Sequence, residues 1–178
     1  MPLGKLGIFM CYYVFVIMHE LSHIVVALLL KVDIKEIVLL PIGVNAKYDE
    51  KISGVKEFVI SLAGPLASFL FAILFKDIKF VFMNISVAIF NLIPIYPLDG
   101  GKILRNFFAI LFGKKKGRKL AYIVTKIFIT LLLLISIILV AYFKNYYALL
   151  LGICIYSIAK EELEKEQFYG IINYLQTY

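Results

Sequence analysis

Charged residues are scarce in this sequence of 178 residues: Asp, Glu, Lys and Arg make up 17% of it, whereas 62% of the residues are hydrophobic. Soluble domains carry about a quarter charged residues, so this balance excludes an ordinary soluble protein and indicates a membrane protein. Cysteine is also scarce. Cys11 and Cys154 both fall within apolar runs and are expected to behave as small hydrophobic residues, so neither a disulfide framework nor a cysteine metal site is implied.

Histidine occurs only twice, as His19 and His23, in the segment His-Glu-Leu-Ser-His within an apolar run. The i, i+4 spacing places both imidazoles on one face of a helix, where a divalent metal could bridge them. Glu20 lies beside that face, where a carboxylate can take a proton from water without being a metal ligand. A proton relay or a chance cluster would show the same residues. Polar groups inside a membrane span persist mainly where they pair, coordinate or conduct, which favours a zinc site.

The apolar runs predict an all-α polytopic membrane protein with about five transmembrane helices. The expected spans cover residues 6–30, 58–75, 80–98, 120–143 and the shorter run 146–159. Residues 31–57 are too charged to span a bilayer. Their partial alternation and turn-forming residues predict short strands at the membrane surface, although a plain connecting loop fits the sequence equally well. No small-residue cleavage site follows Lys5, so the first run is interpreted as a retained helix and not as a signal peptide.

The third expected span ends in a segment with two prolines, Pro94 and Pro97, which cannot continue a regular helix. Irregular backbone at membrane depth normally lines a cavity within the protein. Asp99, which follows, could therefore reach inward as a third metal ligand and complete a His-His-carboxylate site. Alternatively, Asp99 could cap the next helix, expected over residues 101–112. Asn91 could be a helix-packing amide or a donor to a substrate carbonyl.

Basic residues are concentrated in short segments between the apolar runs, and the net charge is +7. They are interpreted as topology determinants and contacts to anionic lipid, with no nucleic-acid partner. Residues 113–119 are expected to form a basic loop, and residues 161–178 a short cytoplasmic amphipathic tail that follows a membrane core over residues 1–160. If five spans cross, fourteen Lys and Arg residues lie on one side against four on the other, which marks the first side as cytoplasmic.

Three segments together resemble the site-2 protease family of intramembrane zinc metalloproteases, peptidase family M50. These segments are His-Glu-Leu-Ser-His at 19–23, Ser-Leu-Ala-Gly-Pro-Leu at 61–66 and Asn-Leu-Ile-Pro-Ile-Tyr-Pro-Leu-Asp-Gly-Gly at 91–101. The resemblance covers residues 14–165 and is nearest to the sporulation branch, which processes the sigma-K precursor. It implies that His19, His23 and Asp99 hold one Zn²⁺ and that Glu20 is the general base. It also implies that Asn91 and Pro97 position substrate.

The resemblance further implies a membrane-associated β-hairpin within residues 31–57, where an extended substrate could add as a strand. Relatives commonly have another helix before the His-Glu helix, and the sporulation enzyme usually carries a nucleotide-sensing CBS domain. The sequence shows neither, nor a PDZ-like insertion, so we expect no PDZ or CBS domain. The expected location is the bacterial cell membrane, in a multi-pass topology with the active site in its cytoplasmic half.

The expected activity is hydrolysis of peptide bonds in membrane-associated proteins, and the expected substrate is a precursor sigma factor. Membrane-embedded inhibitory partners are also compatible with the family. Three other functions remain open: clearing remnant signal peptides or cleaving another membrane regulator, transporting a metal or protons without catalysis, and acting as an inactive binding partner. A transporter would need a polar route across the whole membrane, and the apolar third and fourth runs offer little of one.

Overall fold

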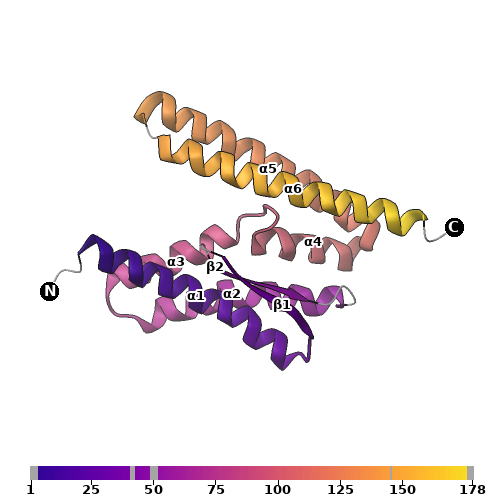
Figure 1. Ribbon diagram of the computed structural model, residues 1–178, viewed down its shortest axis with the longest axis horizontal. Coiled ribbons are helices and arrows are strands. Elements are labelled where there is room, and N and C mark those ends of the chain that lie inside the picture. The colour runs from indigo at the N-terminus through magenta and orange to yellow at the C-terminus, as the bar shows by residue number, and fades with distance from the viewer. Residues whose placement is uncertain (1–3, 41–42, 49–51, 145, 176–178) are drawn as a thin grey trace. The chain divides into compact units, whose positions relative to one another are not determined.

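The computed structural model describes residues 4–40, 43–48, 52–144 and 146–175 (Figure 1). Helices dominate the described residues, together with one pair of short strands. The chain forms two compact units, Met1–Ile93 and Pro94–Tyr178, which are described in turn.

The first unit is built on helix α1 (Lys5–Leu29), which packs against α2 (Gly54–Leu74); α3 (Ile78–Asn91) packs on α2 in turn. Side chains define where α2 and α3 begin. Ser53 Oγ accepts a hydrogen bond from the amide of Lys56, and Asp77 Oδ1 accepts one from the amide of Lys79. Such caps satisfy amides that have no partner within the helix. The predicted helices over 6–30 and 58–75 are thus confirmed, with small shifts at their ends.

The third expected span, residues 80–98, needs correction because α3 ends at Asn91 after 14 residues. The segment that follows is irregular, as the two prolines predict, and contains a cis peptide bond between Tyr96 and Pro97. Proline lacks the amide hydrogen that a helix needs, so the helical pattern of the apolar residues is overridden. The irregular segment leads directly to Asp99.

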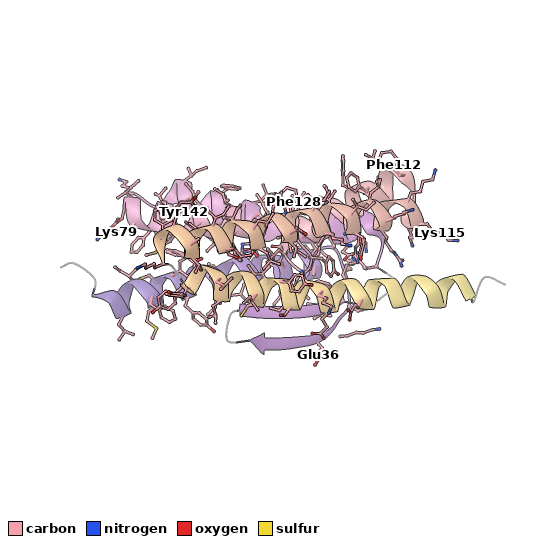
Figure 2. The ribbon with its side chains drawn as sticks, turned by 90° about the horizontal axis from the view of Figure 1, so that it is seen from above. Glu36, Lys79, Phe112, Lys115, Phe128 and Tyr142 are labelled. Carbon is pink, nitrogen blue, oxygen red and sulfur yellow. The ribbon has the colours of Figure 1, made fainter. Side chains whose placement is uncertain are left out.

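Strands β1 (Ile34–Leu40) and β2 (Gly43–Tyr48) pair antiparallel between α1 and α2, from Leu40 opposite Gly43 to Ile34 opposite Tyr48. The prediction of short strands is therefore confirmed over that of a plain loop, although residues 41–42, which join the strands, lie outside the described residues. The register shifts between Ile34 and Glu36. Figure 2 shows the exposed Glu36 side chain projecting away from β1.

Two apolar clusters hold the first unit together. Ala27, Val32 and Ile60 are buried where the end of α1 meets α2, and the Lys56 ammonium donates to the carbonyl of Leu30 at 2.8 Å beside them. Elsewhere in the unit, one ring each from α1, from the C-cap of α2 and from α3 meet edge to face, with centroids 5.3 to 5.7 Å apart; these are Phe15, Phe75 and Phe80. Edge-to-face pairs add to the stabilisation that burial of the rings provides.

The second unit contains α4 (Asp99–Phe112), α5 (Lys114–Phe143) and α6 (Tyr146–Leu175), with α5 packed against both other helices. The predicted basic loop over 113–119 is wrong. Only Gly113, with a φ of 83°, separates α4 from α5, and the lysines form the first turn of α5. Gly117 explains this, since a Cβ there would lie 2.4 Å from the backbone nitrogen of Ala109 on α4. This close helix packing outweighs the loop-like composition.

Helices α5 and α6 run side by side (Figure 1), and Gly152 of α6 lies against Ser136 of α5. Figure 2 shows Lys115 near one end of α5 and Tyr142 near the other. Three helices are long and apolar enough to cross a membrane, and α3 is a shorter apolar helix. These three long helices cover Leu6–Leu29, Gly54–Leu74 and Lys114–Phe143. The expected fifth run is the first half of α6, which continues as one helix past residue 160 into charged sequence.

Candidate metal centre

Helix α1 carries His19 and His23 on one face, as their spacing predicts, and buries both: His19 is 0% exposed and His23 7%. Their Nε2 atoms face each other at 3.4 Å. Two imidazole nitrogens at this separation inside an apolar unit suit a shared cation, because each can offer a lone pair to the same ion.

The other ring nitrogen of each histidine is held by α2. His23 Nδ1 donates to the carbonyl oxygen of Ile60 at 2.7 Å, and His19 Nδ1 shares a hydrogen bond of 3.0 Å with Ser68 Oγ. A carbonyl can only accept, so His23 carries its hydrogen on Nδ1 and keeps a lone pair on Nε2 when its ring is neutral. Histidines that bind metals are usually oriented in this way, by a hydrogen bond at the nitrogen that does not bind the ion.

Gly64 makes room for the two imidazoles. A Cβ at this position would lie 2.3 Å from His23 Nε2 and 2.6 Å from His19 Nε2, distances that no real side chain tolerates. The absent side chain therefore leaves space directly beside the two nitrogens that face each other. Pro65 follows without interrupting α2, although its nitrogen cannot donate to the carbonyl of Ser61.

Asp99 is the first residue of α4, and its carboxylate is buried, with 6% of the residue exposed. The N-cap position is Leu98, so the alternative in which Asp99 caps the helix is not the arrangement found. Gly101 lets the preceding chain fold back onto the start of α4, because a Cβ there would lie 2.5 Å from the amide nitrogen of Tyr96. The Lys102 ammonium lies 4.0 Å from the carboxylate.

His19, His23 and Asp99 form the metal-binding triad: each is buried, and one ligand atom from each lies within 4.8 Å of those of the other two. Two imidazoles and one carboxylate are the protein ligands of many catalytic zinc sites, which keep a further position open. The donor set and the space beside Gly64 both fit zinc.

The sequence matches the profile of peptidase family M50 over residues 7–79 and 78–135. The chain belongs to peptidase family M50. Among curated proteins, it is 33% identical over 170 residues to a zinc metalloprotease of Methanocaldococcus jannaschii, covering 87% of this chain and 49% of that protein. It is 30% identical over 131 residues to the stage IV sporulation protein FB of Bacillus subtilis, covering 66% and 46% respectively. The chain thus spans about half the length of these relatives.

The solved structure of a site-2 protease from Methanocaldococcus jannaschii is also similar, with a TM-score of 0.69 and 32% identity. The match covers 89% of this chain and 79% of that one. M50 membership and the long apolar helices together make the chain a multi-pass membrane protein.

The remaining predicted site residues are Glu20, Asn91 and Pro97, which lie on α1, on α3 and in the segment before α4. Glu20 follows His19 on α1 and is half-buried. Asn91 is the last residue of α3, where its Nδ2 donates to the carbonyl of Val87 at 3.0 Å. Pro97 is half-buried in the irregular segment before α4. Their roles in catalysis and substrate binding stay predictions.

Sequence reasoning missed the residues of α2 that support the histidines. Ser68 and the Ile60 carbonyl orient the rings, and Gly64 gives them space. The sequence feature that could have revealed Gly64 and Ser68 is the run of small residues at 61–68, which was interpreted as a sign of close helix packing alone. A backbone carbonyl leaves no signature in a sequence, whereas a serine seven residues after a buried polar position could have been weighed as a histidine partner.

Proposed function

We propose that this M50 protein is an intramembrane zinc metalloprotease that hydrolyses peptide bonds of membrane-associated proteins. The observation that carries the proposal is the buried triad of His19, His23 and Asp99, with both histidines oriented by hydrogen bonds from within an apolar unit. Ionisable groups buried at such a place are costly unless they coordinate, pair or take part in chemistry. The names of the relatives as zinc metalloprotease and site-2 protease support the same activity.

A zinc ion on these three ligands would supply Lewis acidity, which polarises a scissile carbonyl and makes a water molecule easier to deprotonate. Glu20 is adjacent to His19 and half-buried, so it is close to the triad along α1. We assign Glu20 as the general base, which accepts a proton from the attacking water and passes it to the nitrogen of the leaving amine. The carboxylate is regenerated when the amine departs.

Substrate positioning is assigned to Asn91 and Pro97. The Asn91 amide uses one hydrogen on the Val87 carbonyl, and an amide nitrogen carries a second that can be donated to a substrate carbonyl. An extended substrate would add to the edge of the antiparallel pair β1–β2, by the main-chain pairing that many peptide-binding proteins use. A helical substrate would have to unwind first.

For topology, we propose five crossings, in which α3 and the apolar half of α6 complete the three long spans. The excess of Lys and Arg on one side supports an active site in the cytoplasmic half of a bacterial cell membrane. A fusion reporter placed after Gly113 and another after Lys144 should report opposite sides of the membrane. The same side for both would contradict the arrangement.

For the substrate, we propose a membrane-associated precursor sigma factor, with remnant signal peptides or another membrane regulator as the alternative. The similarity to the stage IV sporulation protein supports the first, although the archaeal relative matches a larger share of this chain. Co-expression with a precursor sigma factor and, separately, with a remnant signal peptide distinguishes the two. If the sigma factor stays intact and the signal peptide is cut, the sporulation substrate is excluded.

The activity itself is tested with Glu20→Gln beside the exposed control Glu164→Gln, which lies on α6 and pairs with Lys160 at 3.9 Å. We expect Glu20→Gln to keep its zinc while cleavage falls by roughly 10²-fold or more, the range for loss of a general base. Glu164→Gln should cleave like the wild type. Retained cleavage in Glu20→Gln would contradict the assignment, and zinc transport into vesicles by both variants would favour a transporter.

A further inference from the structure

Asn84, in the middle of α3, is a fully buried amide that the proposed mechanism does not use. Its Nδ2 donates to the carbonyl of Phe80 at 2.9 Å. Its Oδ1 is buried without a hydrogen-bond partner among the described residues. Buried polar atoms are nearly always paired, directly or through water, because leaving one unpaired costs free energy. Asn84 Oδ1 therefore calls for a donor close by.

The phenylalanine contacts fix the level of Asn84 in the first unit. Phe15 on α1 and Phe80 on α3 touch through their rings. His19 lies four residues beyond Phe15, and Asn84 four residues beyond Phe80, so each is about one turn, roughly 6 Å, past this contact on the same helix face. The two helices run in the same direction because each is antiparallel to α2. Asn84 is thus level with His19.

Ser68 on α2 lies about one helical turn away from the level of Asn84. It lies seven residues before Phe75, whose ring touches that of Phe80, and α2 runs opposite to α3. Measured from the contact between the Phe75 and Phe80 rings, Ser68 lies roughly 10.5 Å away along α2 and Asn84 roughly 6 Å away along α3. The two side chains are therefore offset along the helix axes by about one turn. Ser68 and Asn84 are both 0% exposed, and α2 packs on α3. One water molecule spans such an offset between two polar atoms.

The hydrogen bond of Ser68 explains what Asn84 would do. For His19 to offer the lone pair of Nε2 to a metal, its Nδ1 must carry the hydrogen and donate to Ser68 Oγ. The hydroxyl hydrogen of Ser68 must then point elsewhere, toward an acceptor. Asn84 Oδ1, about one turn away, is a buried acceptor that has no hydrogen-bond partner among the described residues.

We propose that Asn84 is a positioning residue of the metal site: one buried water accepts the hydroxyl hydrogen of Ser68 and donates to Asn84 Oδ1, which turns a lone pair of Ser68 Oγ toward His19 Nδ1. Asn84 thereby favours the ring form of His19 that can bind zinc, without touching the ion. The inference rests on the proposed zinc site and is independent of proteolysis.

The test measures zinc affinity and, separately, thermal unfolding of the metal-free full chain in detergent, for Asn84→Leu, Ser68→Ala and the double variant. Leucine has nearly the shape of asparagine without its hydrogen bonds. We expect Asn84→Leu to weaken zinc binding roughly tenfold, the lower end for loss of a partner that orients a ligand. In the Ser68→Ala background, Asn84→Leu should change the affinity less than twofold, because both act through one chain of hydrogen bonds.

Two further variants keep the result interpretable. Ser86→Ala changes a half-buried serine on α3 that donates to the carbonyl of Phe82, and it should bind zinc like the wild type. Asn84→Ala leaves space for water in place of the amide, so it covers the case in which Asn84→Leu does not fold and should weaken zinc binding less than leucine does.

Unchanged zinc affinity in Asn84→Leu and Asn84→Ala, with altered thermal unfolding, would show a packing amide and overturn the inference. The inference would also be overturned if Asn84→Leu weakened zinc binding by the same factor in the Ser68→Ala background as in the wild type. A wild type that binds no zinc would instead overturn the proposed function together with the inference, which distinguishes the two failures.

Discussion

Helices α2 and α5 are both long, apolar and suited to crossing a membrane, yet their side chains are used differently. In the most apolar 18-residue window, 39% of the residues of α2 are buried, against 17% for α5. The buried positions of α2 include Ser61, Gly64, Pro65 and Ser68, while α5 exposes leucine and isoleucine along most of its length.

This difference separates the helix that builds the metal site from the helix that mainly faces its surroundings. Small and polar residues in α2 let α1 approach closely and satisfy the histidine nitrogens. Helix α5 buries only a narrow stripe against α4 and α6. Overall hydrophobicity thus indicates that both helices suit a membrane. The small and polar residues indicate that α2 is the helix that supports the metal site.

The largest effect should come from a metal ligand. His19→Ala removes one of the two imidazoles, so zinc affinity should fall by more than the roughly 10–100-fold expected for loss of a partner that merely orients a ligand. Isothermal titration of metal-free protein with zinc measures it. Since His23 is the only other histidine, tight binding that survives in His19→Ala would place the metal elsewhere and undo the contrast between the helices.

A smaller effect is expected from Gly64→Ala, because the added methyl group would press on both Nε2 atoms. Displacing the rings should weaken zinc binding about 10–100-fold. The matched control is Gly152→Ala on α6, whose methyl group would press on Ser136 of α5 at 2.8 Å. Zinc affinity should stay unchanged in Gly152→Ala; equal losses in both variants would mean that α2 has no special role.

A pair of buried serines sharpens the comparison further. Ser68→Ala removes the partner of His19 Nδ1 and should weaken zinc binding about tenfold. Ser136→Ala removes a hydroxyl that donates to the carbonyl of Leu133 within α5, and zinc binding should not change. If Ser136→Ala weakened binding as much as Ser68→Ala, loss of helix packing would explain both results.

The smallest effect is expected on the exposed face of α5. Leu134 is 51% exposed, so Leu134→Ala should change the free energy of unfolding by less than about 0.5 kcal/mol and leave zinc affinity intact. Denaturant titration in detergent gives the first quantity and zinc titration the second. A marked loss of zinc in this variant would connect α5 to the metal site and contradict the separation.

Much of the metal centre could be predicted from the sequence because its chemistry is local. The spacing of His19 and His23 fixes a shared helix face, and the prolines before Asp99 force the chain out of α3 ahead of α4. What could not be predicted depends on contacts between helices. The Ile60 carbonyl has no sequence signature, and Ser68 and Gly64 are indistinguishable from residues that serve packing alone.

The wrongly predicted loop at 113–119 also depends on contacts between helices. Glycines and lysines at 113–119 are typical of a loop, but the close approach of Gly117 to Ala109 of α4 makes this segment the start of α5. Helix α6 continues as one helix past the change from apolar to charged residues near 160. The composition of a segment indicates whether it faces water or lipid, whereas contacts with neighbouring helices determine where a helix begins and ends.

The central claim is that His19, His23 and Asp99 hold zinc, and X-ray absorption at the zinc edge tests it most directly. The account predicts one zinc per chain with two imidazole nitrogens at about 2.0–2.1 Å, further oxygen ligands and no sulfur. The spectrum should lose its imidazole signature in His19→Ala. A sulfur ligand at about 2.3 Å, which would point to Cys11 or Cys154, or a spectrum unchanged by His19→Ala, would contradict the account.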